Sequence, residues 1–306
     1  MSTLSPPASS CYSQSAMHKI RTIAVLPTLF TLGNLVCGFF AIVVAARVEK
    51  PLTSEVKHSA PIATINPIKA IKKYDPTDDT HNCMLSGWLI FLAMLFDALD
   101  GHVARLAKST SDFGAELDSL CDLVTFGIAP AFLLVKMCPH FTFEHQDAVW
   151  VIAASYAACA AMRLARFNVE TDEEDDHMHF TGLPSPAAAA SIASFAILFY
   201  TLRKETNAFW YADQLDVAMQ TVLPFFGVLV ALLMVSRIPY PHVVNQVFNG
   251  QRSFAHVVMV LSTLTAVMVI KGVAVPIISG LFVLMGPANY LWQEYIQRRP
   301  HKEPLF

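Results

Sequence analysis

Charged residues are scarce in this sequence. Asp, Glu, Lys and Arg together make up 15% of its 306 residues, whereas hydrophobic residues make up 54%. A soluble domain is typically about 45–50% apolar, so this composition favours a protein of the lipid bilayer. The net charge of −3 is small, and the chain has neither a basic arm nor a stretch in which aromatic and basic residues alternate. These absences argue against nucleic acid as a partner.

Cysteine is too sparsely placed to indicate a metal or disulfide framework. The six cysteines show no C-x-x-C spacing, and most lie in apolar segments, where a thiol acts as a small hydrophobic group. We therefore expect neither a zinc site nor disulfides. Residues 1–18 are rich in Ser and Pro and contain no apolar core, so we expect a disordered N-terminal tail and not a cleaved signal peptide.

Long apolar runs, in contrast, are abundant. A helix needs roughly 20 apolar residues to cross a bilayer. About eight runs meet this requirement, at residues 26–46, 83–104, 112–136, 148–167, 184–202, 217–235, 255–271 and 273–293. The pattern predicts an all-α, polytopic integral membrane protein with one membrane domain over residues 19–296 and a basic C-terminal tail over residues 297–306. The last two spans should form a tight helical hairpin.

Two connections between these spans are longer than the rest. Residues 47–82 contain several prolines, which predicts an irregular loop on the membrane surface. Residues 170–179 are rich in acidic residues and His; this run could pass for a metal site, but a solvated acidic loop is the favoured interpretation. With an even number of spans both termini share one side, and the basic residues outside the 47–82 loop favour the cytoplasm for that side.

Four aspartates interrupt the apolar runs at a fixed spacing: Asp97, Asp100, Asp118 and Asp122. Positions three or four apart share one face of an α-helix, so each pair projects together, and the short linker between the helices makes them antiparallel neighbours. Carboxylates at membrane depth are costly unless cations neutralise them. Hard oxygen ligands select Mg²⁺ or Mn²⁺. A single aspartate in a membrane helix is often only a hydrogen-bond partner of a neighbouring helix, but four at this spacing favour a metal site.

Small residues and one arginine accompany the aspartates. Gly101 and Gly114 remove side chains where a ligand must approach the backbone. Arg105 supplies a permanent positive charge that suits a diphosphate. This combination favours phosphoryl transfer from a nucleotide diphosphate, in which metal ions neutralise the leaving group and a carboxylate deprotonates the attacking alcohol.

The aspartate frame resembles a known family signature. Residues 97–122 match, at every position, the pattern D-x2-D-G-x2-A-R-x8-G-x3-D-x3-D of the CDP-alcohol phosphatidyltransferases. Members of this family are integral membrane enzymes that move a phosphatidyl group from a CDP-linked lipid to an alcohol and release CMP. The resemblance implies the same activity here, with two Mg²⁺ or Mn²⁺ ions as cofactors.

The resemblance also implies roles for individual residues. Asp97, Asp100 and Asp118 would bind one metal ion. Asp97, Asp118 and Asp122 would bind a second, and Asp122 would be the general base. Residues 26–34 look like the first helix of the family, although a threonine on a membrane helix often bonds only its own backbone. The residues expected to contact the CDP-lipid are Thr28, Thr31, Gly101, Arg105, Ser111 and Gly114.

Further segments look like one branch of the family. Residues 163–168 and 180–189, followed by 234–241, resemble the phosphatidylserine synthase branch, so the expected substrates are CDP-diacylglycerol and L-serine. The serine carboxylate needs a cation, and Arg163, Arg166 and Arg237 fall at helix ends on the side of the aspartates, where a bidentate pair can form. Alternatively they are positively charged membrane anchors. Inositol phosphate, glycerol phosphate and choline remain alternative acceptors.

The likeness further implies a multi-pass protein of the cell inner (plasma) membrane, with its active site facing the cytoplasm and a homodimer as a common state of the family. Two other classes of protein make different predictions. A transporter or lipid scaffold should have lost at least one of the four aspartates, and a polyprenyl or sugar-nucleotide phosphotransferase does not need this compact frame. Metal-dependent CMP release from CDP-diacylglycerol separates the three classes.

Overall fold

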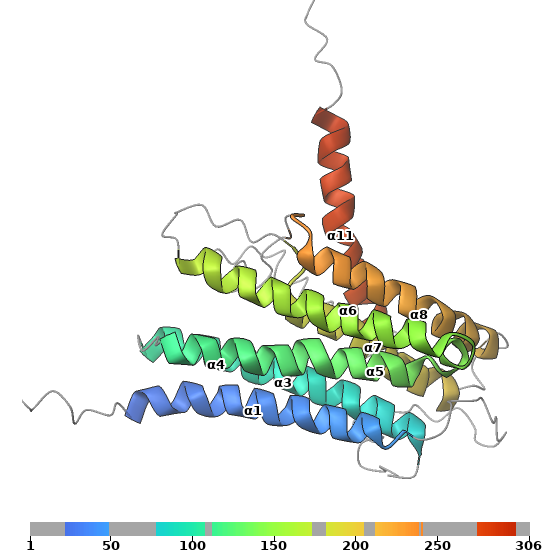
Figure 1. Ribbon diagram of the computed structural model, residues 1–306, viewed down its shortest axis with the longest axis horizontal. Helices are drawn as coiled ribbons and strands as arrows, with labels where there is room; N and C mark the ends of the chain where they lie inside the picture. The colour runs from blue at the N-terminus through green and yellow to red at the C-terminus, as the bar shows by residue number, and fades with distance from the viewer. Residues whose placement is uncertain are drawn as a thin grey trace, which may run out of the picture.

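A computed structural model describes residues 22–48, 78–107, 112–172, 182–204, 212–238, 240 and 274–297 of the chain. Within these ranges every regular element is helical (Figure 1). The elements are α1 (Thr22–Ala46), α3 (Asp79–Ala107), α4 (Asp112–Asp122), the π-helix η2 (Leu123–Ile128), α5 (Ala129–Met137), α6 (Pro139–Asp172), α7 (Ser185–Lys204), α8 (Ala212–Val235) and α11 (Ala274–Gln297). The predicted all-α class is confirmed.

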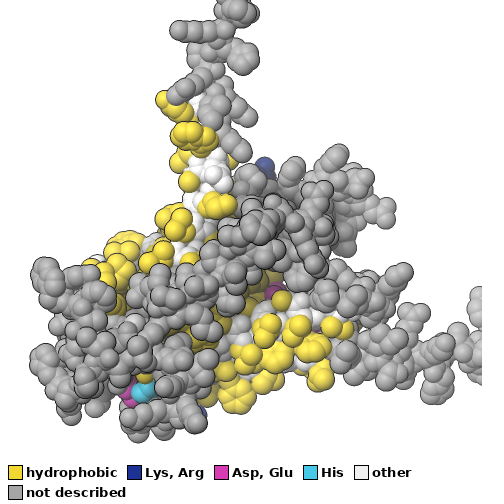
Figure 2. Space-filling model, turned by 180° about the vertical axis from the view of Figure 1, so that it is seen from behind, with side chains coloured by type: hydrophobic (Ala, Val, Ile, Leu, Met, Phe, Trp, Pro, Cys, Tyr) yellow, Lys and Arg dark blue, Asp and Glu magenta, His cyan; other side chains and the backbone are white. Residues whose placement is uncertain are grey.

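Seven stretches of the described chain are long and apolar enough to cross a membrane. They are Thr28–Ala46, Asp79–Gly101, Phe113–Met137, Asp147–Val169, Ser185–Arg203, Gln214–Val235 and Val275–Trp292. Each lies within a few residues of a predicted span, while the remaining predicted span, 255–271, lies outside the described residues. Hydrophobic side chains dominate the visible surface of the described helices (Figure 2), as expected where lipid is the solvent. The chain is therefore a multi-pass membrane protein.

Two predicted boundaries were wrong. The loop predicted to end at residue 82 ends earlier, because Asp78 accepts hydrogen bonds from the backbone N–H groups of Thr80 and His81 and so starts α3. The acidic run begins inside α6, which continues to Asp172. The span predicted over residues 112–136 is confirmed as Phe113–Met137, although the π-helical turns of η2 separate α4 from α5 within it.

Helix α7 is the best covered of these spans, with 72% of its span buried inside the protein. It packs against α3, α8 and α11. Its buried residues include several small ones, such as Ala188, Ala193 and Ala196. A Cβ atom added at Gly87 of α3 would stand 2.9 Å from the carbonyl oxygen of Ala193. Small residues thus let the helix backbones approach closely, the usual basis of helix association in membranes.

The N-terminal end of α3 and the C-terminal end of α7 share a buried polar cluster. Arg203 forms an ion pair with Asp216 at 3.0 Å, and Gln220 donates to the same carboxylate at 2.8 Å. The hydroxyl of Tyr200 lies 3.2 Å from Nε2 of His81. These charges are paired inside the bundle, as buried ions must be. The cluster lies at the end of α3 opposite to Asp97 and Asp100 and closes the bundle there.

Helix α11 packs on α7 and then projects away from the other helices (Figure 1). Tyr240, which follows α8, provides a further contact with it. The Tyr240 hydroxyl donates to the carbonyl oxygen of Val283 at 2.9 Å. That carbonyl would ordinarily accept from residue 287, but Pro287 has no N–H. Burial raises the pKa of Tyr240 to about 12, so its hydroxyl stays protonated and remains a donor. Gly286 leaves room for the tyrosine ring, since a Cβ there would collide with it.

Candidate active site

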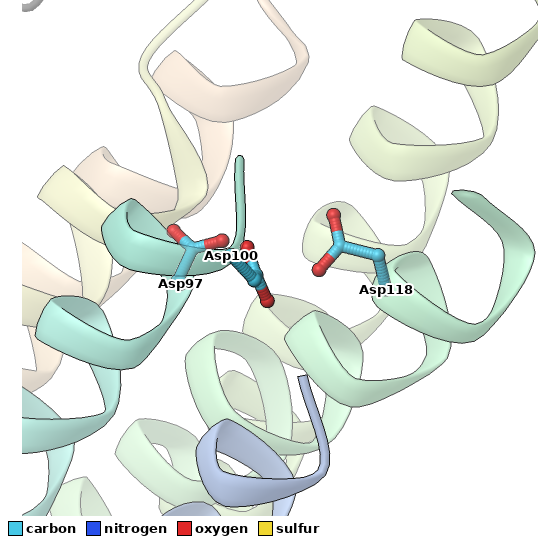
Figure 3. A group of neighbouring side chains, drawn as sticks. All are labelled: Asp97, Asp100 and Asp118. Atoms are coloured by element: carbon cyan, nitrogen blue, oxygen red, sulfur yellow. The ribbon is translucent and has the colours of Figure 1, made fainter. Parts of the chain in front are cut away.

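Three of the four predicted aspartates converge on one point. Asp97 and Asp100 extend from α3, and Asp118 extends toward them from α4 (Figure 3). One carboxylate oxygen from each residue can be chosen so that all three atoms lie within 4.8 Å of one another. The predicted pairing of Asp97 with Asp100, and the approach of Asp118 to this pair, are therefore confirmed.

The environment of this three-aspartate cluster suits a bound cation. Asp100 is 5% exposed, and Asp97 and Asp118 are partly buried. Oδ2 of Asp100 and Oδ1 of Asp118 are buried and have no hydrogen-bond partner among the described residues. Buried carboxylate oxygens without partners are costly. A divalent cation with oxygen ligands would pair these atoms, so the residues present fit the metal that the sequence predicts.

Asp122 is held separately from the cluster. It is the last residue of α4, directly before η2, and it is partly buried. Its Oδ1 accepts a hydrogen bond from Nδ2 of Asn34 on α1 at 2.9 Å. Asp122 does not belong to the group of three whose ligand atoms meet, although it lies one helical turn after Asp118.

Helix α1 lies against both halves of the site, since it packs on α3 and on α4. Thr31, predicted to bind the donor lipid, is 6% exposed, and its side chain hydrogen bonds to Asp100. Thr28 is partly exposed one turn earlier. The predicted first-helix segment thus reaches the aspartates.

The glycines of the frame differ in their surroundings from those of the helix contacts. Gly101 is exposed, and a Cβ added there would meet no atom within 4 Å. This leaves open space directly after Asp100. Gly114 is partly buried on α4. Arg105 lies on α3, but its side chain is outside the described part of the structure, as is Ser111 entirely.

Arg163, one of the three predicted serine-binding residues, interacts electrostatically with the aspartates. Its guanidinium group is largely buried, and its positive charge interacts with the carboxylates of Asp122 and Asp97. Nη1 donates to the hydroxyl of Ser185, the first residue of α7, at 2.7 Å. Nε is buried and has no partner among the described residues. Arg163 therefore has a donor left for a ligand beside the carboxylates.

The other two predicted arginines have different surroundings. Nη1 of Arg166 donates to the carbonyl oxygen of Val235 at 3.1 Å, at the C-terminus of α8. A cation at that position satisfies one of the terminal carbonyls of the helix. Arg237 is exposed just beyond α8. The structure thus distinguishes three residues that the sequence treated alike.

Several residues at the site were missed by the sequence analysis. Asn34 and Ser185 contact Asp122 and Arg163, and Ser119 of α4 donates to Oδ1 of Asn168 on α6 at 3.1 Å. For Asn34 a signal existed, because it follows Thr31 by three residues and so shares its helix face. Ser185 falls within the 180–189 segment that resembles one branch of the family, but its spacing from Arg163 gives no signal that the two residues are in contact.

The comparison with protein families agrees with this geometry. The family model described as CDP-alcohol phosphatidyltransferase matches residues 24–235, which include the aspartates, α1 and the Arg163 region. The match covers more than half of the chain.

Individual relatives are similar over the same region. Proteins named CDP-diacylglycerol--serine O-phosphatidyltransferase are 38% identical over 160 residues in Methanocaldococcus jannaschii and 31% identical over 213 residues in Helicobacter pylori strain 26695. The first match covers 52% of this chain and 65% of that protein, and the second covers 70% and 82%. A protein of Methanothermobacter thermautotrophicus named archaetidylserine synthase is 36% identical over 158 residues, which cover 51% of this chain and 57% of the relative.

Proposed function

This chain belongs to the CDP-alcohol phosphatidyltransferase family, and we propose that it transfers the phosphatidyl group of CDP-diacylglycerol to L-serine, giving phosphatidylserine and CMP. The three-aspartate cluster with its unpaired buried oxygens carries the chemical part of this proposal. The names of the relatives, two of which specify serine as the acceptor, support the choice of substrate.

The aspartates would hold the cofactor. Asp97, Asp100 and Asp118 would bind one Mg²⁺ or Mn²⁺ ion, and Asp122 would join Asp97 and Asp118 around a second. When bound, such ions would neutralise the negative charge on the diphosphate and on the departing CMP. The unpaired oxygens of Asp100 and Asp118 are the observation that supports this assignment.

The donor would lie over the open surface beside Gly101. No atom lies within 4 Å of a Cβ built at this position, so a diphosphate can approach the helix backbone there. Arg105, one turn along α3, would pair with the phosphates. The remaining residues proposed to contact the CDP-lipid are Thr28, Thr31, Ser111 and Gly114.

Asp122 would act as the general base. In the transfer step the serine hydroxyl oxygen attacks the phosphorus that carries the diacylglycerol group, and the bond between that phosphorus and the oxygen of CMP breaks. The hydroxyl proton passes to a carboxylate oxygen of Asp122, and CMP leaves with the bonding electron pair. Oδ1 of Asp122 already accepts from Asn34, which fixes the orientation of the carboxylate.

Arg163 is the strongest candidate for the serine carboxylate. Its positive charge interacts with the aspartates, one nitrogen is anchored by Ser185, and Nε has no described partner. A planar guanidinium of this kind can bind a carboxylate through two parallel hydrogen bonds. Arg166 and Arg237 are the weaker candidates, since one binds the end of α8 and the other is exposed.

The site is proposed to open to the cytoplasmic side of the inner membrane, where CDP-lipid head groups and free serine are found. A single cysteine placed near residue 110, in a variant without other accessible thiols, tests this orientation. It should react with a membrane-impermeant maleimide only after the inner face is made accessible. Labelling from the outer face of intact cells would invert the topology.

The function itself is tested by the acceptor dependence of CMP release. Purified protein with Mn²⁺ or Mg²⁺ and CDP-diacylglycerol should release CMP rapidly with L-serine and much more slowly with inositol phosphate, glycerol 3-phosphate or choline. Chelation of the metal should abolish the reaction. Faster release with one of the other alcohols would keep the family chemistry and exclude serine as the acceptor.

A further inference from the structure

Asn34 is the buried side chain in direct contact with the proposed general base. It is fully buried on α1, and its Nδ2 donates to Oδ1 of Asp122, 88 residues further along the chain. We propose that Asn34 is a positioning residue that orients the Asp122 carboxylate for proton transfer. This role rests on the function proposed above.

The hydrogen bonds of the amide support this role. The Nδ2 contact to Asp122 is 2.9 Å long, while Oδ1 of Asn34 is buried with no partner among the described residues. Turning the amide over would place its oxygen against a carboxylate oxygen, and two acceptors repel each other. The carboxylate therefore determines the orientation of the amide, and leaving the amide oxygen unpaired is the cost of this arrangement.

The backbone beneath Asn34 is fixed to the segment that follows Asp122. The hydroxyl of Thr125, on η2, donates to the carbonyl oxygen of Asn34 at 3.2 Å. One turn later on α1, a Cβ added at Gly38 would lie 2.8 Å from Cα of Thr125, so the two backbones are in direct contact. Short π-helical segments inside helices are frequent at functional sites, and this one begins directly after Asp122. The backbone that carries Asn34 is thus held directly against the segment that follows Asp122.

The same face of α1 contacts the other half of the site. Thr31, three residues before Asn34, hydrogen bonds to Asp100 of α3, whereas Asn34 bonds to Asp122 of α4. One helix therefore holds a carboxylate from each of the two helices that carry the aspartates. A catalytic group must be held within about 0.5 Å of its productive place, and a rigid neighbouring helix is suited to this.

The direct test removes the donor and keeps the size of the side chain. In Asn34→Leu, kcat should fall by about 10- to 100-fold, the loss typical of a misplaced catalytic group, while the KM values for serine and CDP-diacylglycerol stay within about threefold. Ser86→Ala is the matched control, because the Ser86 hydroxyl makes an equally buried bond to the α1 backbone at Ala41, at 2.9 Å. Its kcat should stay within about twofold of the unaltered protein.

A double-mutant cycle separates positioning from packing. In the Asp122→Ala background there is no carboxylate to orient, so Asn34→Leu should reduce the residual turnover by less than about twofold and should lower the melting temperature less than it does alone. An equal loss of kcat in both backgrounds, or an unchanged kcat in Asn34→Leu, overturns the proposal.

A second variant covers the case in which Asn34→Leu does not fold. Asn34→Ser has a shorter side chain that cannot reach Asp122, and it should show the same loss of kcat.

Melting temperatures cover the case in which the unaltered protein releases no CMP and the proposed function fails. The melting temperatures of the four proteins in the cycle still measure the coupling between Asn34 and Asp122. Strictly additive changes in melting temperature overturn the positioning role of Asn34.

Discussion

Arg163 and Ser185 connect the site to the start of α7: Nη1 of the arginine donates to the serine hydroxyl at 2.7 Å. This bond leaves Nε buried without a described partner, beside the proposed place of the acceptor. Arg163→Lys keeps the charge but loses the planar fork. We predict that the KM for serine rises at least about tenfold, because lysine cannot replace both parallel hydrogen bonds of the guanidinium and one hydrogen bond to a charged group is worth about 1.5–3 kcal/mol.

The KM for CDP-diacylglycerol in the same variant is the internal control and should change by less than about twofold. Arg166→Lys is the comparison variant, because a lysine there can still reach the carbonyl of Val235. Steady-state kinetics with serine varied at saturating CDP-lipid measure both. A larger effect on serine KM from Arg166 than from Arg163 would move the acceptor site toward α8.

Asp122 and Asp97 should give different kinetic defects. In Asp122→Asn the amide cannot accept the serine proton, so kcat should fall by about 10²–10⁴-fold while CDP-lipid binding persists. In Asp97→Ala the three-aspartate cluster loses one of its proposed metal ligands, so the Mn²⁺ concentration for half-maximal activity should rise as well. Metal titrations of turnover distinguish the two variants. Near-normal turnover in Asp122→Asn would remove Asp122 from the mechanism.

Two glycines in contrasting surroundings, Gly38 on α1 and Gly280 on α11, test how closely α1 approaches η2. Gly38→Ala places a Cβ against the backbone of Thr125, and we predict a destabilisation of about 1–3 kcal/mol with loss of activity. Gly280→Ala has open space, so it should leave the stability unchanged or raise it by about 0.5–1 kcal/mol. Thermal unfolding in detergent measures both, and equal melting temperatures for the two variants would contradict the close approach of α1 to η2.

Gly101→Ala separates folding from ligand approach. The position is open, so the melting temperature should not fall, yet a methyl group directly after Asp100 obstructs the proposed path of the diphosphate. We expect the KM for CDP-diacylglycerol to rise by about tenfold, roughly 1.4 kcal/mol of binding, with serine KM unchanged. An unaltered CDP-lipid KM would place the donor elsewhere.

Tyr240 should stabilise the fold by donating to the carbonyl of Val283, which has no backbone donor because residue 287 is proline. Tyr240→Phe removes the donor to Val283, and a buried carbonyl without a partner costs about 1–3 kcal/mol. Pro287→Ala restores the backbone N–H, so Tyr240→Phe should cost markedly less in that background. The melting temperatures of the two single variants and the double variant decide this, and additive changes would mean that the hydroxyl does not substitute for the missing amide.

Much of the fold was predictable because lipid imposes a simple rule on composition. Each of the seven spans described lies close to a predicted apolar run, and the paired aspartates follow from helix periodicity alone. The predictions that failed depended on local interactions that composition does not reveal. Asp78 starts α3 earlier than the proline-rich stretch indicated, and nothing in the composition of residues 123–128 distinguishes a π-helix from an α-helix.

Contacts between distant helices were beyond prediction. Asn34 and Asp122 are 88 residues apart, and Arg163 and Ser185 belong to different helices, so neither contact has a local spacing signal. The three arginines illustrate the limit. The sequence places all of them at helix ends. Only the packing shows that Arg163 donates to Ser185 and interacts electrostatically with the aspartates, whereas Arg166 donates to the last carbonyl of α8.

The most direct test of the central claim is the identity of the lipid formed by the purified protein. With CDP-diacylglycerol, Mn²⁺ and isotopically labelled L-serine, mass spectrometry should detect labelled phosphatidylserine in a 1:1 ratio with released CMP, and Asp97→Ala should form little of either. CMP release without labelled phosphatidylserine, or an equal yield from Asp97→Ala, would contradict the account.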